Sequence, residues 1–154
     1  MGYTLAMIEP VLPYLHYLSI IFTGGFLIAE LVMCRPEMTP EQRRRLPGID
    51  VVFFVSALLA LATGLLRLFF YAKGVSFYTG NPFFWTKMAL YVVIAAISIA
   101  PTRAFGRWKR ALNSGAPAPA GPEIAGVRRL LHIELGLLAL IPLMAVLMAR
   151  GIGR

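Results

Sequence analysis

The chain has 154 residues, of which 58% are hydrophobic and only 14% are charged. A soluble domain usually carries about 25% charged residues, so this composition excludes an ordinary soluble domain and indicates an integral membrane protein. The formal net charge is +8 at pH 7, yet ten of the 15 Lys and Arg residues lie within residues 35–45 and 103–129. Charge concentrated in this way indicates membrane topology and not a nucleic-acid partner.

Four apolar segments follow one another along the chain, at residues 11–34, 51–71, 82–100 and 130–149. A helix needs about 20 apolar residues to cross a bilayer core of about 30 Å, and each segment has roughly that length. None shows the alternation of polar and apolar residues that barrel strands require. The sequence therefore predicts one all-α domain over residues 1–154, an integral membrane four-helix bundle. The first segment is too long for the apolar core of a cleavable signal, so we expect it to stay in the mature protein.

The connections between the segments predict how the bundle is oriented. The first and third connections hold the ten clustered basic residues, and they share a side when four helices run up and down. Short basic connections mark the cytoplasmic side of a membrane. Aromatic residues surround the second connection, at residues 72–81, as is typical of the outer interface. We therefore expect a multi-pass protein of the bacterial inner (cytoplasmic) membrane with both termini on the outer side.

Polar residues within each segment recur at a spacing of three or four, which places them on one face of each helix. In chain order these faces comprise His16, Ser19, Thr23, Glu30 and Cys34; Ser56, Ala60, Thr63, Arg67 and Tyr71; Lys87, Tyr91, Ile94 and Ser98; and His132, Gly136 and Ala139. We expect the four faces to meet in the interior of the bundle. Gly24, Gly25, Gly64 and Gly136 are expected to let helix backbones approach closely.

The alternating direction of the helices predicts a polar layer near the outer side. Counting 1.5 Å per residue places His16, Arg67 and Lys87 at a similar depth, about 9 Å below the outer surface. No carboxylate within the membrane lies at that level, and Glu9 is the only nearby candidate. Because buried charges are normally paired, the two cations indicate an anionic ligand. The alternatives are that both cations reach out to lipid headgroups, and that His16 only makes an interhelical hydrogen bond.

A second polar layer, near the cytoplasmic side, comprises Glu30, His132 and Glu134. Glu134 and His132 lie on opposite faces of the fourth helix, so only one of them can point into the bundle. We expect Glu134 to face outward, where a homo-oligomer through this helix would let it meet Arg128 or Arg129 of a neighbour.

The sequence gives little support for other metal or haem arrangements. His16 and His132 differ in depth by more than about 10 Å, which makes it unfavourable for them to clamp one haem iron from both sides. A single cysteine, Cys34, offers neither an internal disulfide nor a CxxC metal site. The methionines are better explained as gap-filling residues than as copper ligands.

Five motifs carry a resemblance to known families. They are Tyr-Leu-His16-Tyr-Leu-Ser, Arg45-Leu followed by Ile-Asp50, Ala-Thr-Gly64-Leu-Leu-Arg67-Leu-Phe, Gly-Asn-Pro-Phe-Phe-Trp85-Thr-Lys87 and His132-Ile-Glu134-Leu. Over nearly its whole length the chain resembles a bacterial family of predicted membrane proteins of unknown function (DUF2214-like). A first-helix His, a glycine late in the second helix and Trp85-Thr-Lys87 opening the third are more distantly similar to HemJ-type protoporphyrinogen oxidases and CopD-like proteins.

The resemblance to the HemJ type implies haem b, with His16 as the axial metal ligand and Lys87 near the cofactor. Haem propionates would supply anions for the cations. The residues then expected to bind the cofactor are His16, Arg67, Lys87, Tyr71, Tyr91 and Trp85. The fourth helix departs from the HemJ pattern, because Arg129 and His132-Ile-Glu134 replace an Arg-x-x-Asn-Glu-like motif, and this departure weakens the inference of an oxidase activity.

The sequence thus predicts a small haem-b-binding membrane protein with a redox or porphyrin-handling role, acting on a porphyrin or quinone-like small molecule. The alternative is a transporter or accessory subunit that uses the same polar core for a small anion or metal ion, without haem. A third reading is a structural bundle that binds another membrane protein.

Overall fold

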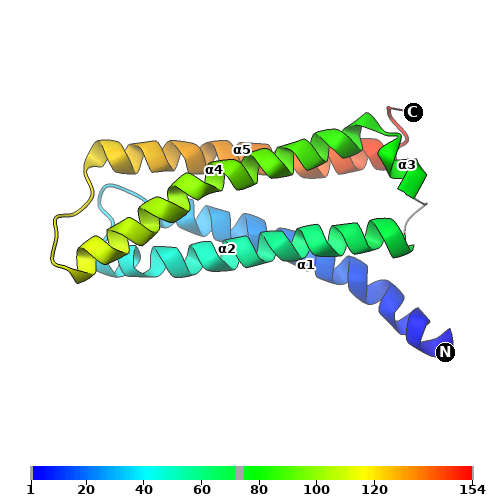
Figure 1. Ribbon diagram of the computed structural model, residues 1–154, viewed down its shortest axis with the longest axis horizontal. Helices are drawn as coiled ribbons and strands as arrows, with labels where there is room; N and C mark the ends of the chain where they lie inside the picture. Colours follow the sequence, from blue (N-terminus) through cyan, green and yellow to red (C-terminus); the bar gives the residue numbers. More distant parts are fainter. Residues whose placement is uncertain (1, 72–74, 154) are drawn as a thin grey trace.

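The protein folds into four long helices and two short ones (Figure 1). The computed structural model describes residues 2–71 and 75–153, with side chains from Pro10 onward except those of residues 70, 71 and 77. The helices are α1 (Gly2–Met33), α2 (Pro40–Leu66), which continues as a π-helical turn η1 (Arg67–Tyr71), α3 (Val75–Thr79), α4 (Pro82–Asn113) and α5 (Gly121–Ala149).

Each of the four long helices contains a stretch long and apolar enough to cross a membrane, within Pro10–Met33, Pro40–Phe69, Pro82–Asn113 and Gly121–Ala149. Large apolar side chains are exposed on all four, including Ile21, Val32, Val51, Val92 and Val146. An exposed apolar surface of this extent suits hydrocarbon and not water. The prediction of an all-α membrane bundle of four apolar helices is confirmed.

The two ends of the bundle differ in character, and we name them for that difference. The basic end holds the connections at residues 34–39 and 114–120, close to the clustered Arg and Lys residues. The aromatic end holds α3, the start of α4 and the last residues of the chain, with Tyr78, Phe83, Phe84 and Trp85. The start of the α1 span at Pro10 also lies toward the aromatic end (Figure 1).

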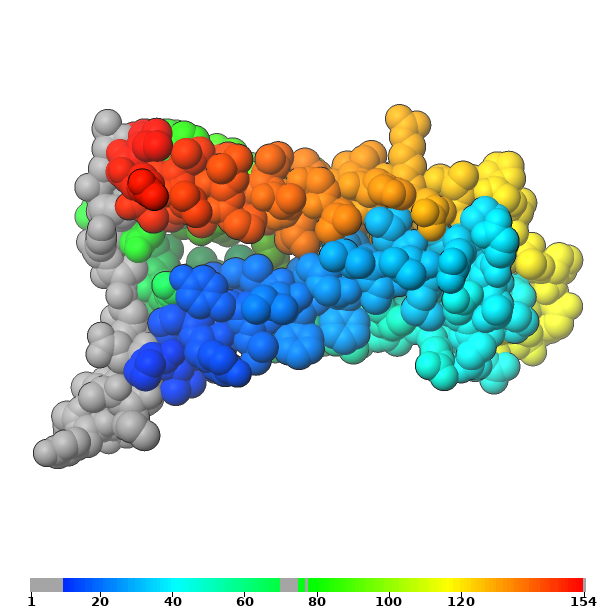
Figure 2. All heavy atoms as spheres, turned by 180° about the vertical axis from the view of Figure 1, so that it is seen from behind, coloured from blue at the N-terminus to red at the C-terminus, as the bar shows by residue number. Residues whose placement is uncertain are grey.

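The four long helices form a ring in the order α1, α2, α4, α5. Helix α1 packs mainly against α2, and α4 mainly against α5, so the bundle consists of two helical hairpins joined by contacts between α2 and α4. The fourth side of the ring, between α1 and α5, has the fewest contacts. Figure 2 shows a hollow between these two helices toward the aromatic end. We call this weakly closed side the α1–α5 seam.

Two clusters of buried apolar side chains hold the ends of the bundle together. The larger cluster, at the basic end, draws on all four long helices and includes Leu27, Leu46, Phe105, Trp108 and Leu131. The smaller cluster, at the aromatic end, contains Leu68, Phe84 and Met148 and no described side chain of α1. Helix α1 is therefore anchored at the basic end and stands apart from α4 and α5 at the other.

The helices are longer than the apolar segments predicted. Helix α2 begins at Pro40 and not near residue 51, α4 continues to Asn113 beyond residue 100, and α5 begins at Gly121 before residue 130. The added turns hold most of the basic residues, and Arg and Lys are good helix formers outside the hydrocarbon core. Hydropathy therefore located the spans but not the helix ends.

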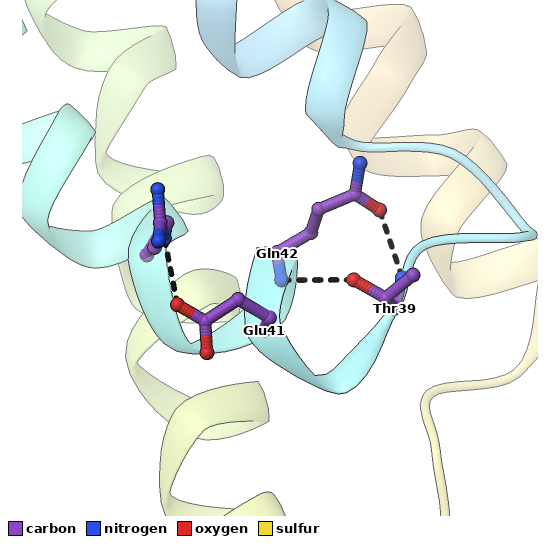
Figure 3. Close-up of polar contacts among 4 residues, drawn as sticks. Thr39, Glu41 and Gln42 are labelled. Carbon is purple, nitrogen blue, oxygen red and sulfur yellow. Dashed lines mark hydrogen bonds and ion pairs between the residues drawn. The ribbon is translucent and has the colours of Figure 1, made fainter.

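The start of α2 shows what sets a helix end in this chain. Thr39 and Gln42 form a reciprocal capping box: the Gln42 N–H donates to Thr39 Oγ1 (3.2 Å), and the Thr39 N–H donates to Gln42 Oε1 (2.8 Å) (Figure 3). Pro40 follows at the first helical position, where its missing N–H costs nothing. Glu41 accepts a hydrogen bond from Arg45 one turn later.

Candidate functional site in the polar hollow

His16 is fixed against α2 by hydrogen bonding with Thr63 and with the Ala60 backbone, and by one close packing contact. Its Nδ1 lies 3.0 Å from Thr63 Oγ1, so this ring nitrogen is engaged with the neighbouring helix. A Cβ atom on Gly64 would lie 3.0 Å from His16 Cε1, which is tighter than nine in ten real Cβ contacts. The absence of a side chain at Gly64 therefore makes room for the ring, and Thr63 sets its orientation.

Two cations lie near His16. Arg67 comes from the turn that ends α2, Lys87 from the first turns of α4, and both interact electrostatically with the His16 ring. The Arg67 guanidinium stands over the Tyr17 ring at 5.4 Å, and the Lys87 ammonium lies 5.6 Å from the centre of the Phe84 ring. Neither cation pairs with a carboxylate among the described side chains. The structure thus brings together the three residues of the predicted outer layer.

Hydroxyl groups line the bundle between the two apolar clusters. Each donates to a carbonyl one turn back on its own helix, at distances from 2.6 to 2.9 Å. These buried side chains are Ser19, Thr23, Ser56, Thr63 and Ser98. Ser98 shares its single proton between the Ile94 carbonyl and Glu134 Oε2. The protons of the other four are used within the helix, so their oxygens keep lone pairs that can accept hydrogen bonds in the interior.

Tyr91 crosses the hollow from α4 to α2, where its hydroxyl donates to the Ala57 carbonyl at 2.5 Å. Trp85, by contrast, is 57% exposed, and its indole N–H donates to the Thr79 carbonyl at 2.9 Å. The structure therefore puts Trp85 at the surface of the aromatic end, away from the His16 ring. The side chain of Tyr71 lies outside the described residues.

The glycines of the stripes do not all serve close packing. A Cβ added at Gly24, Gly25 or Gly136 would meet no atom within 4 Å, whereas one at Gly64 would meet His16. The expectation that all four glycines let helix backbones approach closely is wrong for Gly24, Gly25 and Gly136. The open space at Gly24 and Gly136 agrees with the hollow along the α1–α5 seam (Figure 2).

The second polar layer has a different composition from the one predicted. Glu30 and Glu134 are both 1% exposed and interact electrostatically with each other, so Glu134 points into its own bundle and not outward. His132 is the residue on the exposed face, with Nδ1 2.7 Å from the Arg128 carbonyl. The reason for expecting an oligomer through α5 is therefore removed, although the oligomeric state itself stays a prediction.

Asp50 also belongs to this layer, although the sequence analysis names it only within a family motif. It is 6% exposed, interacts electrostatically with Glu30, and accepts a hydrogen bond from Thr102 at 3.0 Å. Because the predicted apolar segment starts at residue 51, Asp50 lies just outside it and was not placed in either polar layer. The capping box at Thr39 was the available signal, since it predicts that the helix already includes Asp50.

The donor groups of the described residues do not assemble a metal site of their own. No group of three or more His, Cys, Asp or Glu side chains among them is arranged to hold a metal ion. Burial raises the pKa of the Cys34 thiol to about 11, against a smaller lowering effect of Arg128. At neutral pH the thiol is therefore protonated, whereas the thiolate is the form that binds metals. The remaining candidate ligand is the oriented ring of His16.

Comparison with known proteins gives one match. The model of a family described as Predicted membrane protein (DUF2214) matches residues 8–153. No curated protein and no solved structure shows significant similarity to the chain.

Proposed function

We propose that this chain, which belongs to the DUF2214 family of predicted membrane proteins, binds haem b in the polar hollow, by which we mean the space beside His16, Arg67 and Lys87. The proposed role is a redox or porphyrin-handling one in the bacterial inner membrane. One observation carries the proposal: His16 is held in a fixed orientation beside two cations that have no carboxylate partner among the described side chains. An amphipathic ligand with negative groups at one edge is the chemistry that such a site favours.

The residues of the hollow fit haem b. A histidine that binds a metal usually engages its other ring nitrogen in a hydrogen bond. Here Thr63 engages Nδ1, so Nε2 would be the nitrogen that binds iron. Arg67 and Lys87 would neutralise the propionates, and the hydroxyls and Tyr91 would line the space beside the ring. Bound haem would supply one-electron chemistry, while this chain would hold, orient and partly shield the cofactor from water.

The experiment is an absorption spectrum of the full-length protein purified in mild detergent from haem-replete cells. We expect a red sample with a Soret band, and loss of most of that band in His16→Ala. His132→Ala is the matched control, because His132 is exposed on the outer face of α5. A colourless wild-type protein, or equal haem loss in both variants, would contradict the proposal.

A second candidate is a carrier or accessory subunit for a small organic anion, without haem. Arg67 and Lys87, which have no carboxylate partner among the described side chains, favour it as well, since they would hold a free carboxylate as readily as a propionate. The thermal stability of haem-free protein distinguishes the two. A rise in Tm with a simple dicarboxylate such as succinate that disappears in both Arg67→Gln and Lys87→Gln, in a sample without a Soret band, supports the carrier.

A further inference from the structure

Three carboxylic acids lie buried in the basic half of the bundle, and the proposed haem site does not use them. Glu30 of α1 and Glu134 of α5 are 1% exposed, and Asp50 of α2 is 6% exposed. Each interacts electrostatically with the other two, so the three form one cluster contributed by three helices. We call it the carboxyl cluster.

The hydrogen bonds of the carboxyl cluster are incomplete. Glu134 Oε2 accepts from Ser98 at 2.8 Å, and Asp50 Oδ1 accepts from Thr102 at 3.0 Å. The Oε1 atoms of Glu30 and of Glu134 are fully buried with no hydrogen-bond partner. An ionised carboxylate is costly in such surroundings unless hydrogen bonds or a cation compensate it, so these two oxygens indicate a missing positive ligand.

The charged and titratable groups around the cluster do not supply that ligand. Arg128 of α5 directs its guanidinium to the carbonyls of Leu31 and Cys34 and bonds to none of the three acids. The Cys34 thiol is neutral at physiological pH, because burial raises its pKa to about 11. Helix α4 contributes the hydroxyls of Ser98 and Thr102. A metal ion is disfavoured as well, since the described residues hold no suitable group of ligands.

We propose that Glu30, Asp50 and Glu134 form a buried proton-binding site that exchanges protons with the polar hollow. Like charges held close together cannot all ionise in a medium of low polarity, so the cluster keeps at least one proton at neutral pH. A carboxyl that binds a proton also gains a donor, which relieves the unpartnered oxygens. Binding and release involve only this proton and leave every covalent bond to carbon unchanged.

Access to the cluster is from the hollow and not from the basic end. On the basic side, the buried side chains of Trp108, Ile124 and Val127 close the bundle. On the other side, Ser98 bonds directly to Glu134, and the hydroxyl of Thr23 lies two turns from Glu30 on the same helix face. Buried hydroxyl groups therefore lead from the His16 site toward the carboxyl cluster, and Ser98 is the one that reaches it.

Infrared spectroscopy of the full-length protein in lipid tests the protonation directly. At neutral pH we expect a C=O stretching band of protonated carboxylic acid that shifts when H2O is replaced by D2O. The band loses intensity in Glu30→Gln and in Glu134→Gln, which keep side-chain size. The matched control, Glu37→Gln, changes an exposed carboxylate in the 34–39 connection and leaves the band unaltered. Absence of the acid band from the wild-type protein would overturn the proposal.

Thermal unfolding provides a second readout that does not depend on haem. Raising the pH from neutral to alkaline removes the bound proton and leaves uncompensated charge in the interior, so the wild-type Tm falls. In Glu30→Gln and Glu134→Gln the same change of pH lowers the Tm less, because fewer buried groups ionise. An equal fall in wild type and variants contradicts a proton site. So does stabilisation by Na⁺ over K⁺ at fixed pH, since it assigns the cluster to a metal cation.

Discussion

Gly64 is the residue on which the position of the His16 ring depends. The ring lies so close to α2 that a methyl group at residue 64 would sit 3.0 Å from Cε1. Neither partner can move freely, because Gly64 is part of a helix and His16 Nδ1 is engaged by Thr63. A glycine inside a helix is normally unfavourable by about 0.5–1 kcal/mol relative to alanine, so its presence here reflects a need for space.

Gly64→Ala is therefore expected to displace the ring and lower haem content, measured as Soret absorbance per protein. The matched control is Gly24→Ala, because a Cβ at Gly24 meets no atom within 4 Å. That variant should keep its haem and gain roughly 0.5–1 kcal/mol of helix stability. Full haem occupancy in Gly64→Ala, with an unchanged Tm, would show that the ring does not need this contact.

The sequence identified some residues of the hollow and not others, for a physical reason. A spacing of three or four residues is a property of the helix itself, so the side chains of His16 and Lys87 could be placed on an interior face. Trp85 was named with the family resemblance and not from this spacing. It lies two residues before Lys87, so it takes a different face of α4, and the structure has it at the surface.

At the scale of the helices, Arg128 of α5 caps the end of α1. Its guanidinium donates to the carbonyl of Leu31, at 2.9 Å, and to the carbonyl of Cys34. The last carbonyls of a helix have no partner within it, and the negative end of the helix dipole lies there. Arg128 thus hydrogen-bonds to the free carbonyls and also offsets the negative end of the helix dipole. The same contacts link α1 to α5 at the basic end of the α1–α5 seam.

Replacing Arg128 by Met removes this cap and should lower the stability of the bundle by about 1.5–3 kcal/mol, the usual range for hydrogen bonds to a charged group. Thermal unfolding in detergent measures the change. Arg129→Met is the matched control, since Arg129 is exposed and next in sequence. Equal Tm values for the two variants would mean that the carbonyls find water instead.

Apolar length predicted that four helices exist, but the contacts between them follow from residues outside the apolar spans. Arg128 and Thr39 both lie in stretches that were predicted to be connections, because these stretches are beyond the hydrocarbon core. Hydropathy indicates which residues can lie in the hydrocarbon core, whereas helix caps and interhelical hydrogen bonds depend on the geometry of individual side chains. The spans could therefore be predicted and the helix ends could not.

For the whole molecule, the distribution of charge predicts its orientation. Ten of the 15 basic residues lie in the sequence stretches 35–45 and 103–129, close to the two connections of the basic end, so that end should face the cytoplasm. The fold supports the test, because residues 76 and 118 are exposed at opposite ends of the bundle.

Single cysteines introduced as Ser76→Cys and Ala118→Cys should react differently with a membrane-impermeant maleimide applied to cells whose outer membrane has been opened. We expect immediate labelling at residue 76, and labelling at residue 118 only after the inner membrane is disrupted. The native Cys34 gives no background, because it is fully buried with a pKa of about 11. The reverse pattern would place the basic end outside.

The weakly closed seam between α1 and α5 has a consequence for the supply of ligand. A hollow that opens between two membrane helices faces acyl chains, so a ligand of this hollow would reach it from the bilayer, as from a two-dimensional solution. Occupancy is then set by the mole fraction of the ligand among the lipids and not by its concentration in water. For a sparingly soluble amphiphile, partitioning into the membrane enriches it at the protein before any contact forms. A modest intrinsic affinity is therefore enough to fill the site.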